Sequence, residues 1–323
     1  MGVVSLRDLR ITALPGPALR IGLDHLGPWI DVAAARAADG ADVVIVDTAG
    51  LRAAGPGREA DLIQHATRWA HAAGAPTVLW STAPAGLDQP LLDLADRFDA
   101  VAAADPEMTA LVTAGRRRPA RVPWGAVHVD VDAAPIPLEH RAPIAAFVGA
   151  WSTRNRGAAK WLGAVLAAIG LERIEVVAWP ELTGGGAAAA EPWPQELAPA
   201  VRGAGAGAGI ALLRRARVVI WADPTHGSPD FVAPGYLQAM ASGGALVSHR
   251  GRTLSDHFLR APALLANPRD ERLEQTLQAL VCGSDDAAQT RARAGVALAV
   301  GQHAIAHRLA SLASLVGVRA LVD

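Results

Sequence analysis

The first candidate for chemistry in this sequence is a polar loop between a predicted strand and a predicted helix. In the segment FVGAWSTRNRG, residues 147–157, an apolar run ends at Gly149, and Arg154 and Arg156 follow it. The first N–H groups of a helix have no partner within the helix and its dipole makes that end positive, so anions bind there. Arginine adds paired hydrogen bonds to phosphate oxygens. The loop is therefore a candidate phosphate site, and a solvated loop in an arginine-rich chain is the alternative.

A second polar segment, His226–Arg250, follows another predicted strand. It carries Asp230 in a loop rich in glycine and proline, then Gln238 in a predicted helix that ends at a Ser242–Gly244 turn. Polar groups at the carboxyl ends of parallel strands lie where α/β sheets bind ligands. An ordinary loop followed by a helix-ending glycine is the alternative. We expect Asp230 and Gln238 to lie near these strand ends.

Two pairs of residues could in principle bind a metal ion. His303 and His307 stand four residues apart in a predicted helix, a spacing that places them on one face. The zinc-protease pattern also needs a glutamate and a third ligand, which this segment lacks. Asp130 and Asp132 could hold a metal–diphosphate, but they lie beside a proline-rich connector, where charged residues are common. The sequence therefore predicts no metal site.

The alternating segment GAGAGAG, Gly203–Gly209, invites comparison with glycine loops that bind dinucleotides. Such loops directly follow a strand and open a helix, with an acidic residue about 20 positions further on. No strand is evident before Gly203. We therefore expect a flexible connector here. Gly184–Ala190 is a second stretch of low complexity. A phosphate loop is the less favoured alternative.

Short β-rich runs alternate with longer helical stretches on both sides of a proline-rich connector, Val131–Pro143. Before it we expect strands at Ala41–Asp47, Pro76–Thr82, Ala100–Ala104 and Arg121–Trp124, and helices at Arg58–Ala73, Leu91–Arg97 and Pro106–Ala114. After it we expect strands at Ile144–Ala150, Arg173–Trp179, Arg217–Asp223 and Ala245–His249, and helices at Gly157–Ile169, Ile210–Ala216 and Pro234–Ser242. This alternation is typical of βαβ units with parallel sheets.

The repeat of that alternation predicts two Rossmann-like α/β domains that face a cleft. The connector places their boundary between residues 139 and 140, giving domains of residues 1–139 and 140–323. A final helix at His303–Leu315 is expected to pack near the hinge.

Composition excludes several classes of protein. Hydrophobic residues make up 51% of the chain and charged residues 19%, which argues against a disordered chain. A net charge of −1, with no basic block beyond Arg116–Arg118, argues against a nucleic-acid partner. The single cysteine, Cys282, excludes an internal disulfide. No apolar run approaches the roughly 18–20 residues of a membrane span, and no signal peptide is evident, so we expect a cytoplasmic protein.

Five groups of segments, in the same order along the chain, resemble one enzyme family. FVGAWSTRNRG with the following WLGAVLAAIG resembles the start of the donor domain of retaining GT-B glycosyltransferases, and SPDFVAPGYLQAMASGGALVS resembles their signature region. PTVLWST with RFDAVAAADPEMTALVTAG and RVPWGAVHVD, then RARVVIWAD, and finally GQHAIAHRLASL are similar to the spore-maturation CgeB-like branch. The resemblance covers roughly Asp42–Leu312.

This resemblance implies a GT-B-like fold with an acceptor-side N-terminal domain and a donor-binding C-terminal domain. It also implies transfer of a sugar from a nucleotide-diphosphate sugar to a saccharide, protein or small metabolite, with retention and without a metal or resident cofactor. Arg154 and Arg156 would hold the diphosphate and Gln238 the ribose, while Asp230 would face the transferred sugar. Catalysis would rest on Asp230 and Arg156. The donor site would be completed by Gly149, Ser242, Gly243 and Gly244.

The sequence departs from the family pattern in two places. The family has glutamate at both positions of its acid pair, where this chain has Asp230 and Gln238. A glycine-rich first loop is not evident, and Leu19–Trp29 is the nearest substitute. A catalytically inactive GT-B-like binding or assembly protein is therefore the alternative function. An epimerase-type relative is a third.

Overall fold

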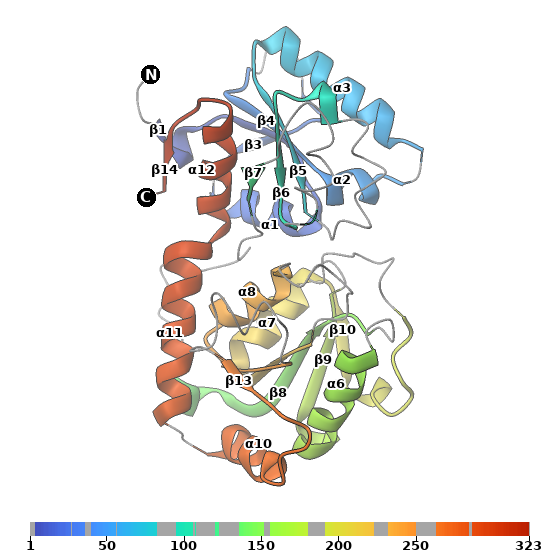
Figure 1. Ribbon diagram of the computed structural model, residues 1–323, viewed down its shortest axis with the longest axis vertical. Coiled ribbons are helices and arrows are strands. Elements are labelled where there is room, and N and C mark those ends of the chain that lie inside the picture. Colours follow the sequence, from blue (N-terminus) through green and yellow to red (C-terminus); the bar gives the residue numbers. More distant parts are fainter. Residues whose placement is uncertain are drawn as a thin grey trace. The chain divides into compact units, whose positions relative to one another are not determined.

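The computed structural model describes residues 4–26, 28–35, 40–55, 57–82, 95–105, 107, 120–122, 136–151, 156–179, 191–222, 232–249, 263–283 and 286–322. The chain divides into two compact units, the first of residues 1–127, 230–232 and 304–323 and the second of residues 128–229 and 233–303. Each unit is built on a six-stranded parallel sheet with helices against it (Figure 1). The predicted fold class, two parallel α/β sheets, is confirmed.

The sheet of the first unit has the strand order β3-β2-β4-β5-β6-β7. Its strands are β2 (Ile11–Leu14), β3 (Trp29–Asp31), β4 (Val43–Asp47), β5 (Thr77–Ser81), β6 (Ala100–Ala103) and β7 (Ala120–Arg121). Its helices are α1 (Pro17–Leu26), α2 (Thr48–Ala53), α3 (Glu59–Ala73) and α12 (Ile305–Leu315). A separate parallel pair joins β1 (Val4–Ser5), which precedes a short 3₁₀ turn at Leu6–Asp8, to β14 (Ala320–Leu321).

Alternate residues of the first sheet supply two cores, because successive side chains of a strand point to opposite faces. In β4, Val43 and Ile45 belong to the core that includes residues of α1 and α12, and Val44 belongs to the core that includes residues of α2 and α3. Figure 1 shows α3 and α12 on opposite sides of this sheet. Leu309 and Leu312 of α12 are fully buried in the first of these cores. This burial explains why residues 304–323 belong to the first unit, whereas the predicted boundary grouped them with the C-terminal domain.

The sheet of the second unit has the strand order β10-β9-β8-β11-β12-β13. Its strands are β8 (Ala142–Gly149), β9 (Ile174–Ala178), β10 (Val201–Ala204), β11 (Ala216–Trp221), β12 (Ala245–Ser248) and β13 (Ala263–Leu265). Its helices are α6 (Arg156–Ile169), α7 (Ala206–Arg215), α8 (Pro234–Ala241), α10 (Leu273–Cys282) and α11 (Asp286–His303), with short 3₁₀ turns at Leu138–His140, Leu171–Arg173 and Ala198–Ala200. Residues of α6 and α10 share one core with alternate residues of the strands.

The predicted flexible connector at Gly203–Gly209 is wrong. Gly203 lies in β10, which pairs with β9, and α7 begins at Ala206. Gly205 joins the two with φ of +84°, a conformation that favours glycine. A Cβ on Gly209 would lie 2.6 Å from Cε3 of Trp179, so glycine allows α7 to pack closely on that ring. The glycines therefore serve a strand–turn–helix unit.

The prediction that His303 and His307 share one face of a single helix is also wrong. The helix α11 ends at His303, Ala304 adopts the extended backbone angles φ −65° and ψ 154°, and α12 starts at Ile305. The two histidines therefore belong to different helices.

Several predicted features lie wholly or partly outside the described residues. They are the helices Leu91–Arg97 and Pro106–Ala114, the end of the strand Arg121–Trp124, the pair Asp130 and Asp132, and the stretch Gly184–Ala190.

Candidate functional site

The second sheet has a point where its strand order reverses, between β8 and β11. In open α/β sheets, ligands bind outside the carboxyl ends of the strands at such a point. Gly149 ends β8 there, and a Cβ on Gly149 would lie 3.8 Å from Cζ3 of Trp221, the last residue of β11. The backbone at Gly149 and the Trp221 ring thus lie side by side at the predicted ligand edge.

Arg156 lies beside this edge because it is the first residue of α6, the helix that follows β8. Its side chain is exposed. The first N–H groups of α6 and the positive end of its dipole lie at this end of the helix. The structure therefore brings Gly149 and Arg156 to the same strand end, as an anion site requires. Arg154 lies outside the described residues.

The helix α8 starts on the carboxyl side of β11, and its first turn rests on Trp221. Pro234 opens the helix, and a Cβ on Gly235 would lie 2.1 Å from Cζ3 of Trp221. Gln238 lies in the middle of α8 and its side chain is 2% exposed. Burial raises the pKa of Tyr236, which keeps its phenol neutral. Asp230, in the segment before α8, lies outside the described residues.

Substituting Gly235 with alanine is expected to destabilise the chain by about 1–3 kcal/mol, the usual cost of overpacking. The new methyl group would overlap the ring of Trp221, which is 4% exposed and therefore held in place by its neighbours. Urea unfolding measures the loss. Gly207→Ala is the matched control, since its Cβ would meet no atom within 4 Å in α7. A Gly235 variant as stable as that control would contradict the close contact.

The structure places Ser242, Gly243 and Gly244 at the opposite edge of the sheet. The helix α8 runs from the carboxyl end of β11 to the amino end of β12, so its last residues lie near the starts of the strands. Ser242 Oγ donates a hydrogen bond to the carbonyl oxygen of Ala239 (2.6 Å), and Gly243 has φ of +75°. A Cβ on Gly244 would lie 2.6 Å from Val219 Cγ2. This turn ends α8 and packs it on the sheet; it does not join Gly149 and Arg156.

Arg141, just before β8, ties two helix ends to this amino edge. Its Nε donates to the carbonyl oxygen of Ile136 (2.8 Å), its Nη2 to that of Ser242 (2.7 Å), and its Nη1 to those of Leu213 (3.3 Å) and Ala216 (3.2 Å). The side chain is buried, which together with Arg214 lowers the pKa of Arg141 to about 10. The Arg141 guanidinium supplies hydrogen-bond donors to carbonyl groups that have no partner within the helices, and its positive charge is favourable at the negative carboxyl ends of the two helices.

His249 directly follows β12 at the carboxyl edge and was not among the predicted site residues. Its ring meets Trp161 of α6 edge to face, with centroids 5.5 Å apart and an angle of 69°. Its backbone N–H donates to the carbonyl oxygen of Trp221 (3.2 Å). Burial lowers the pKa of His249 below its usual value. Its position at the carboxyl end of a predicted strand was the signal that could have identified it.

Acidification below about pH 6.5 is expected to lower the stability of the chain through His249. In the unfolded chain His249 takes up a proton near that pH, whereas burial lowers its pKa in the folded chain. As the pH falls below about 6.5, the proton therefore binds the unfolded chain more readily and favours unfolding. Urea unfolding at several pH values should show a smaller decline for His249→Gln than for the parent chain. His307, whose pKa is also lowered by burial, supplies a remaining decline. Equal declines in parent and variant would contradict the role of His249.

Aromatic side chains gather where β8 ends. Trp151 and Trp193 have ring centroids 6.3 Å apart, and Trp193 meets Phe147 edge to face at 5.7 Å. Glu191 N donates to the carbonyl oxygen of Trp151 at 2.8 Å, which joins the two segments. Both tryptophans are half-buried. Trp193 was not a predicted site residue, because only the tertiary fold brings it to Trp151.

The first sheet reverses its strand order between β2 and β4, where Gly16 and Asp47 lie. Asp47, fully buried, accepts hydrogen bonds from Gly16 N (3.0 Å), Ala49 N (2.8 Å) and Thr82 Oγ1 (2.5 Å). Burial raises the pKa of this carboxyl group, while these donors and the charge of Arg52 oppose the rise. Gly16 lies in the turn that connects β2 to α1. The segment predicted as the substitute for a first loop, residues 19–29, is mostly the helix α1.

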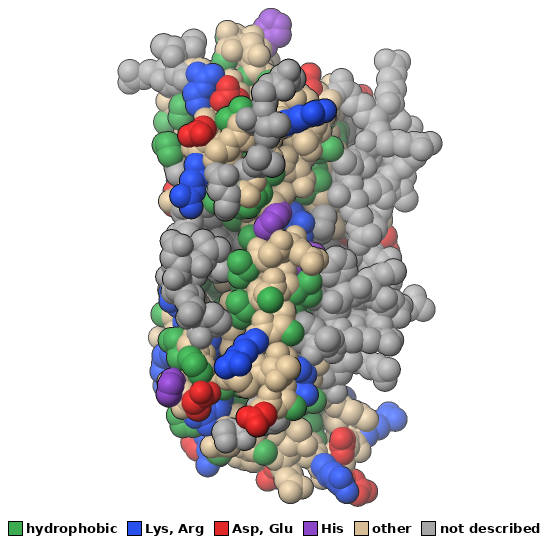
Figure 2. Space-filling view, turned by 90° about the vertical axis from the view of Figure 1, so that its left-hand side faces the viewer, with side chains coloured by type: hydrophobic (Ala, Val, Ile, Leu, Met, Phe, Trp, Pro, Cys, Tyr) green, Lys and Arg blue, Asp and Glu red, His purple; other side chains and the backbone are tan. Residues whose placement is uncertain are grey.

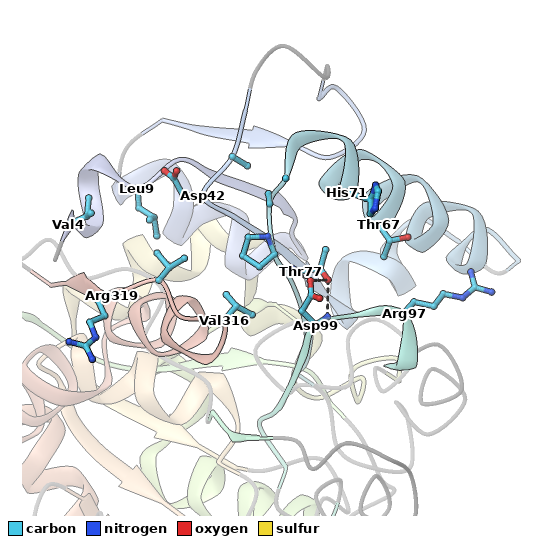
Figure 3. Close-up of a pocket in the computed structure, with 15 residues that line it drawn as sticks. Val4, Leu9, Asp42, Thr67, His71, Thr77, Arg97, Asp99, Val316 and Arg319 are labelled. Atoms are coloured by element: carbon cyan, nitrogen blue, oxygen red, sulfur yellow. Dashed lines mark hydrogen bonds between the residues drawn. The ribbon is translucent and has the colours of Figure 1, made fainter. Parts of the chain in front are cut away.

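A cavity of about 1000 Å³ opens at the amino edge of the first sheet (Figure 3). Its carboxylates are already engaged, since Asp99 accepts from Thr77 N (2.8 Å) and Thr77 Oγ1 (2.9 Å), and Asp42 pairs with Arg10. Figure 3 shows Arg97 and Arg319 at opposite ends of the cavity. Its position, at the starts of the strands, is not where such sheets bind ligands. We place the candidate site at the carboxyl edge of the second sheet instead.

The described part of the chain shows neither a metal cluster nor a membrane helix. No three His, Cys, Asp or Glu side chains in it gather in a way that could hold a metal ion. Within the same residues, no helix is both long and apolar enough to cross a membrane. On the face drawn in Figure 2, described basic and acidic side chains are interspersed.

No protein-family model matches the sequence, and no curated protein matches it. Solved structures do match the fold. An α-glucosyltransferase in complex with UDP and DNA has a TM-score of 0.59 at 9% identity, over 92% of this chain and 96% of that one. Anabaena HepE, in complex with UDP and glucose, has a TM-score of 0.54 at 13% identity, over 95% and 99% of the two chains. TarM has a TM-score of 0.52 at 10% identity, over 85% of this chain and 54% of TarM.

The chain has the GT-B fold. Its two parallel α/β units match those of GT-B glycosyltransferases over nearly the full length of two of these structures, and span about half of TarM. The GT-B resemblance of the sequence is thereby confirmed for the fold. Identities of 9–13% show the fold alone, so the CgeB-like branch and the site residues stay predictions.

Proposed function

We propose that this chain is a glycosyltransferase that moves a sugar from a nucleotide-diphosphate sugar to an acceptor. The observation that carries the proposal is the position of Arg156, at the start of α6 beside the strand reversal of a GT-B second sheet. Solved structures with this fold include two in complex with UDP. The CgeB-like assignment and retention of anomeric configuration rest on the sequence motifs.

The chemistry requires that a nucleoside diphosphate leave as the anomeric bond breaks. Negative charge grows on the diphosphate, and the N–H groups of α6 with the Arg156 guanidinium can stabilise it in place of a metal. In the proposed site Arg154 adds a second guanidinium, Gln238 binds the ribose and Asp230 faces the transferred sugar. Gly149 leaves the backbone open beside the phosphates.

The donor belongs to the second unit in this proposal, and the acceptor to the first. The acceptor would be a saccharide, a protein or a small metabolite, and the protein would act in the cytoplasm. The inferred division of roles corresponds to the predicted domains 1–139 and 140–323, except that residues 230–232 and 304–323 belong to the first unit and residues 128–139 to the second.

A GT-B-like binding or assembly protein without turnover is the second candidate function. It is favoured by Gln238, a neutral residue where the family has an acid. Incubation with a panel of nucleotide sugars, with assay of released nucleotide, separates the two functions. Release supports transfer or slow hydrolysis, binding without release supports the second candidate, and an epimerised sugar supports an epimerase-type relative.

Loss of the Arg156 side chain is expected to weaken binding of UDP or GDP about ten- to a hundredfold, the effect of one lost charge-assisted bond. Titration calorimetry of Arg156→Ala measures the loss, and Arg156→Lys should recover only part of it because lysine lacks the planar fork. Thermal stability should hardly change, since the side chain is exposed. Arg202→Ala, another exposed arginine of this unit, is the control. Unchanged affinity in Arg156→Ala would refute the phosphate site.

A further inference from the structure

Two tryptophans stand beside the proposed diphosphate site without an assigned role. Trp151 lies two residues after β8 ends, in the connection that leads to α6. Trp193 comes from the segment between β9 and β10, and the Glu191–Trp151 backbone hydrogen bond (2.8 Å) joins the two segments. Together they present two indole rings at the carboxyl edge of the second sheet.

Both rings pack against the core of the second unit. Trp193 rests edge to face on the buried ring of Phe147, at 5.7 Å and 80°. Trp151 leans on Trp193 at 6.3 Å and 44°, and lines a cavity of about 10 Å³ with Ala150, Ala158 and other small or apolar residues. Both tryptophans stay half-buried, so each keeps part of its surface open.

Neither indole N–H has a hydrogen-bond partner among the residues that the structure describes. Three other tryptophans do have one: Trp80 donates to Val122 O, Trp161 to Ala266 O and Trp29 to Asp24 Oδ1, whereas the buried Trp69 Nε1 has none among the described residues. Tryptophans that contact ligands commonly offer a large aromatic face together with an indole N–H that has no partner in the protein.

We propose that Trp151 and Trp193 form the surface on which the nucleobase of the donor stacks. This inference rests on the proposed function, because it assumes a nucleoside diphosphate at the start of α6. A planar base gains most from an indole face, and each stacked base contributes about 1–3 kcal/mol, roughly five- to 150-fold in affinity. The tryptophan pair would then bind the nucleoside end while Arg156 binds the diphosphate.

The test compares ligands that share only part of the donor. Calorimetry should show that Trp193→Ala and Trp151→Ala bind UDP and uridine about five- to 150-fold more weakly than the parent chain. Pyrophosphate should bind all of these proteins equally, which also shows that the variants are folded. Trp193→Phe should recover most of the affinity, because it keeps an aromatic face. Trp29→Ala, a half-buried tryptophan of the other unit, is the matched control and should change nothing.

Three results would overturn the inference in distinguishable ways. Parent-like UDP affinity in both alanine variants would remove the stacking surface and leave the proposed function intact. Weaker binding of glucose 1-phosphate with unchanged binding of uridine would assign the rings to the sugar instead of the base. A parent chain that binds no nucleotide diphosphate would remove the proposed function, and the inference with it.

Discussion

Replacing Arg141 with methionine is expected to lower the free energy of unfolding by about 3–5 kcal/mol. The guanidinium donates to four backbone carbonyl groups and is 4% exposed, so its loss leaves buried acceptors without partners. Two of them, at Leu213 and Ser242, lie at the ends of α7 and α8. Equilibrium urea unfolding, followed by circular dichroism, measures the change.

Two further variants separate the hydrogen bonds of the Arg141 guanidinium from the effect of its positive charge. Arg141→Lys should recover a minor part of the loss, because one ammonium group cannot reach four carbonyl groups spread around a planar fork. Arg202→Met removes an exposed arginine that donates to Pro199 O and should cost little. If Arg141→Met were no less stable than Arg202→Met, the proposed anchoring of α7 and α8 would be refuted.

Asp47→Asn is expected to destabilise the chain by about 2–4 kcal/mol, although it changes one atom. Both carboxylate oxygens of Asp47 accept hydrogen bonds, Oδ2 from Gly16 N and Oδ1 from Ala49 N and Thr82 Oγ1. An asparagine amide must place its NH₂ group against one of these donors, so at least one bond is lost in a site with no exposed surface. Urea unfolding again provides the measurement.

The matched control for this variant is Asp42→Asn. Asp42 also lies in the first unit and also accepts backbone and side-chain hydrogen bonds, but its pair with Arg10 is exposed (33% and 61%). Exposed pairs contribute up to about 1 kcal/mol. An equal loss in the two variants would show that burial of Asp47 adds nothing to its role.

Much of the fold follows from local patterns in the sequence. The β-branched runs before Asp47, Gly149 and Trp221 are short, apolar and followed by helical stretches, a pattern typical of buried parallel strands. The structure has strands at each of them. The same local pattern predicts the start of α6, so the sequence by itself indicates that Gly149 and Arg156 lie at one strand end.

Strands with weak patterns of their own were missed. The strands β2, β10 and β13 are short, and β10 contains Gly203, which has low strand propensity. Pairing with β9 makes that segment a strand, and such pairing joins residues far apart in the chain. The composition of the glycine repeat by itself predicts a connector. In the structure the same segment forms the end of a strand, a turn and the closely packed start of a helix.

By itself, the sequence determined the alternation of strands and helices, the GT-B class and the polar loop that leads into α6. Only the tertiary structure decided which edge of the second sheet each residue occupies. Ser242–Gly244 lies with Arg141 at the amino edge, and Trp193 contacts Trp151 at the carboxyl edge. Propensity and periodicity act over a few residues, whereas the direction of a helix and the contacts of a buried side chain depend on the whole packed sheet.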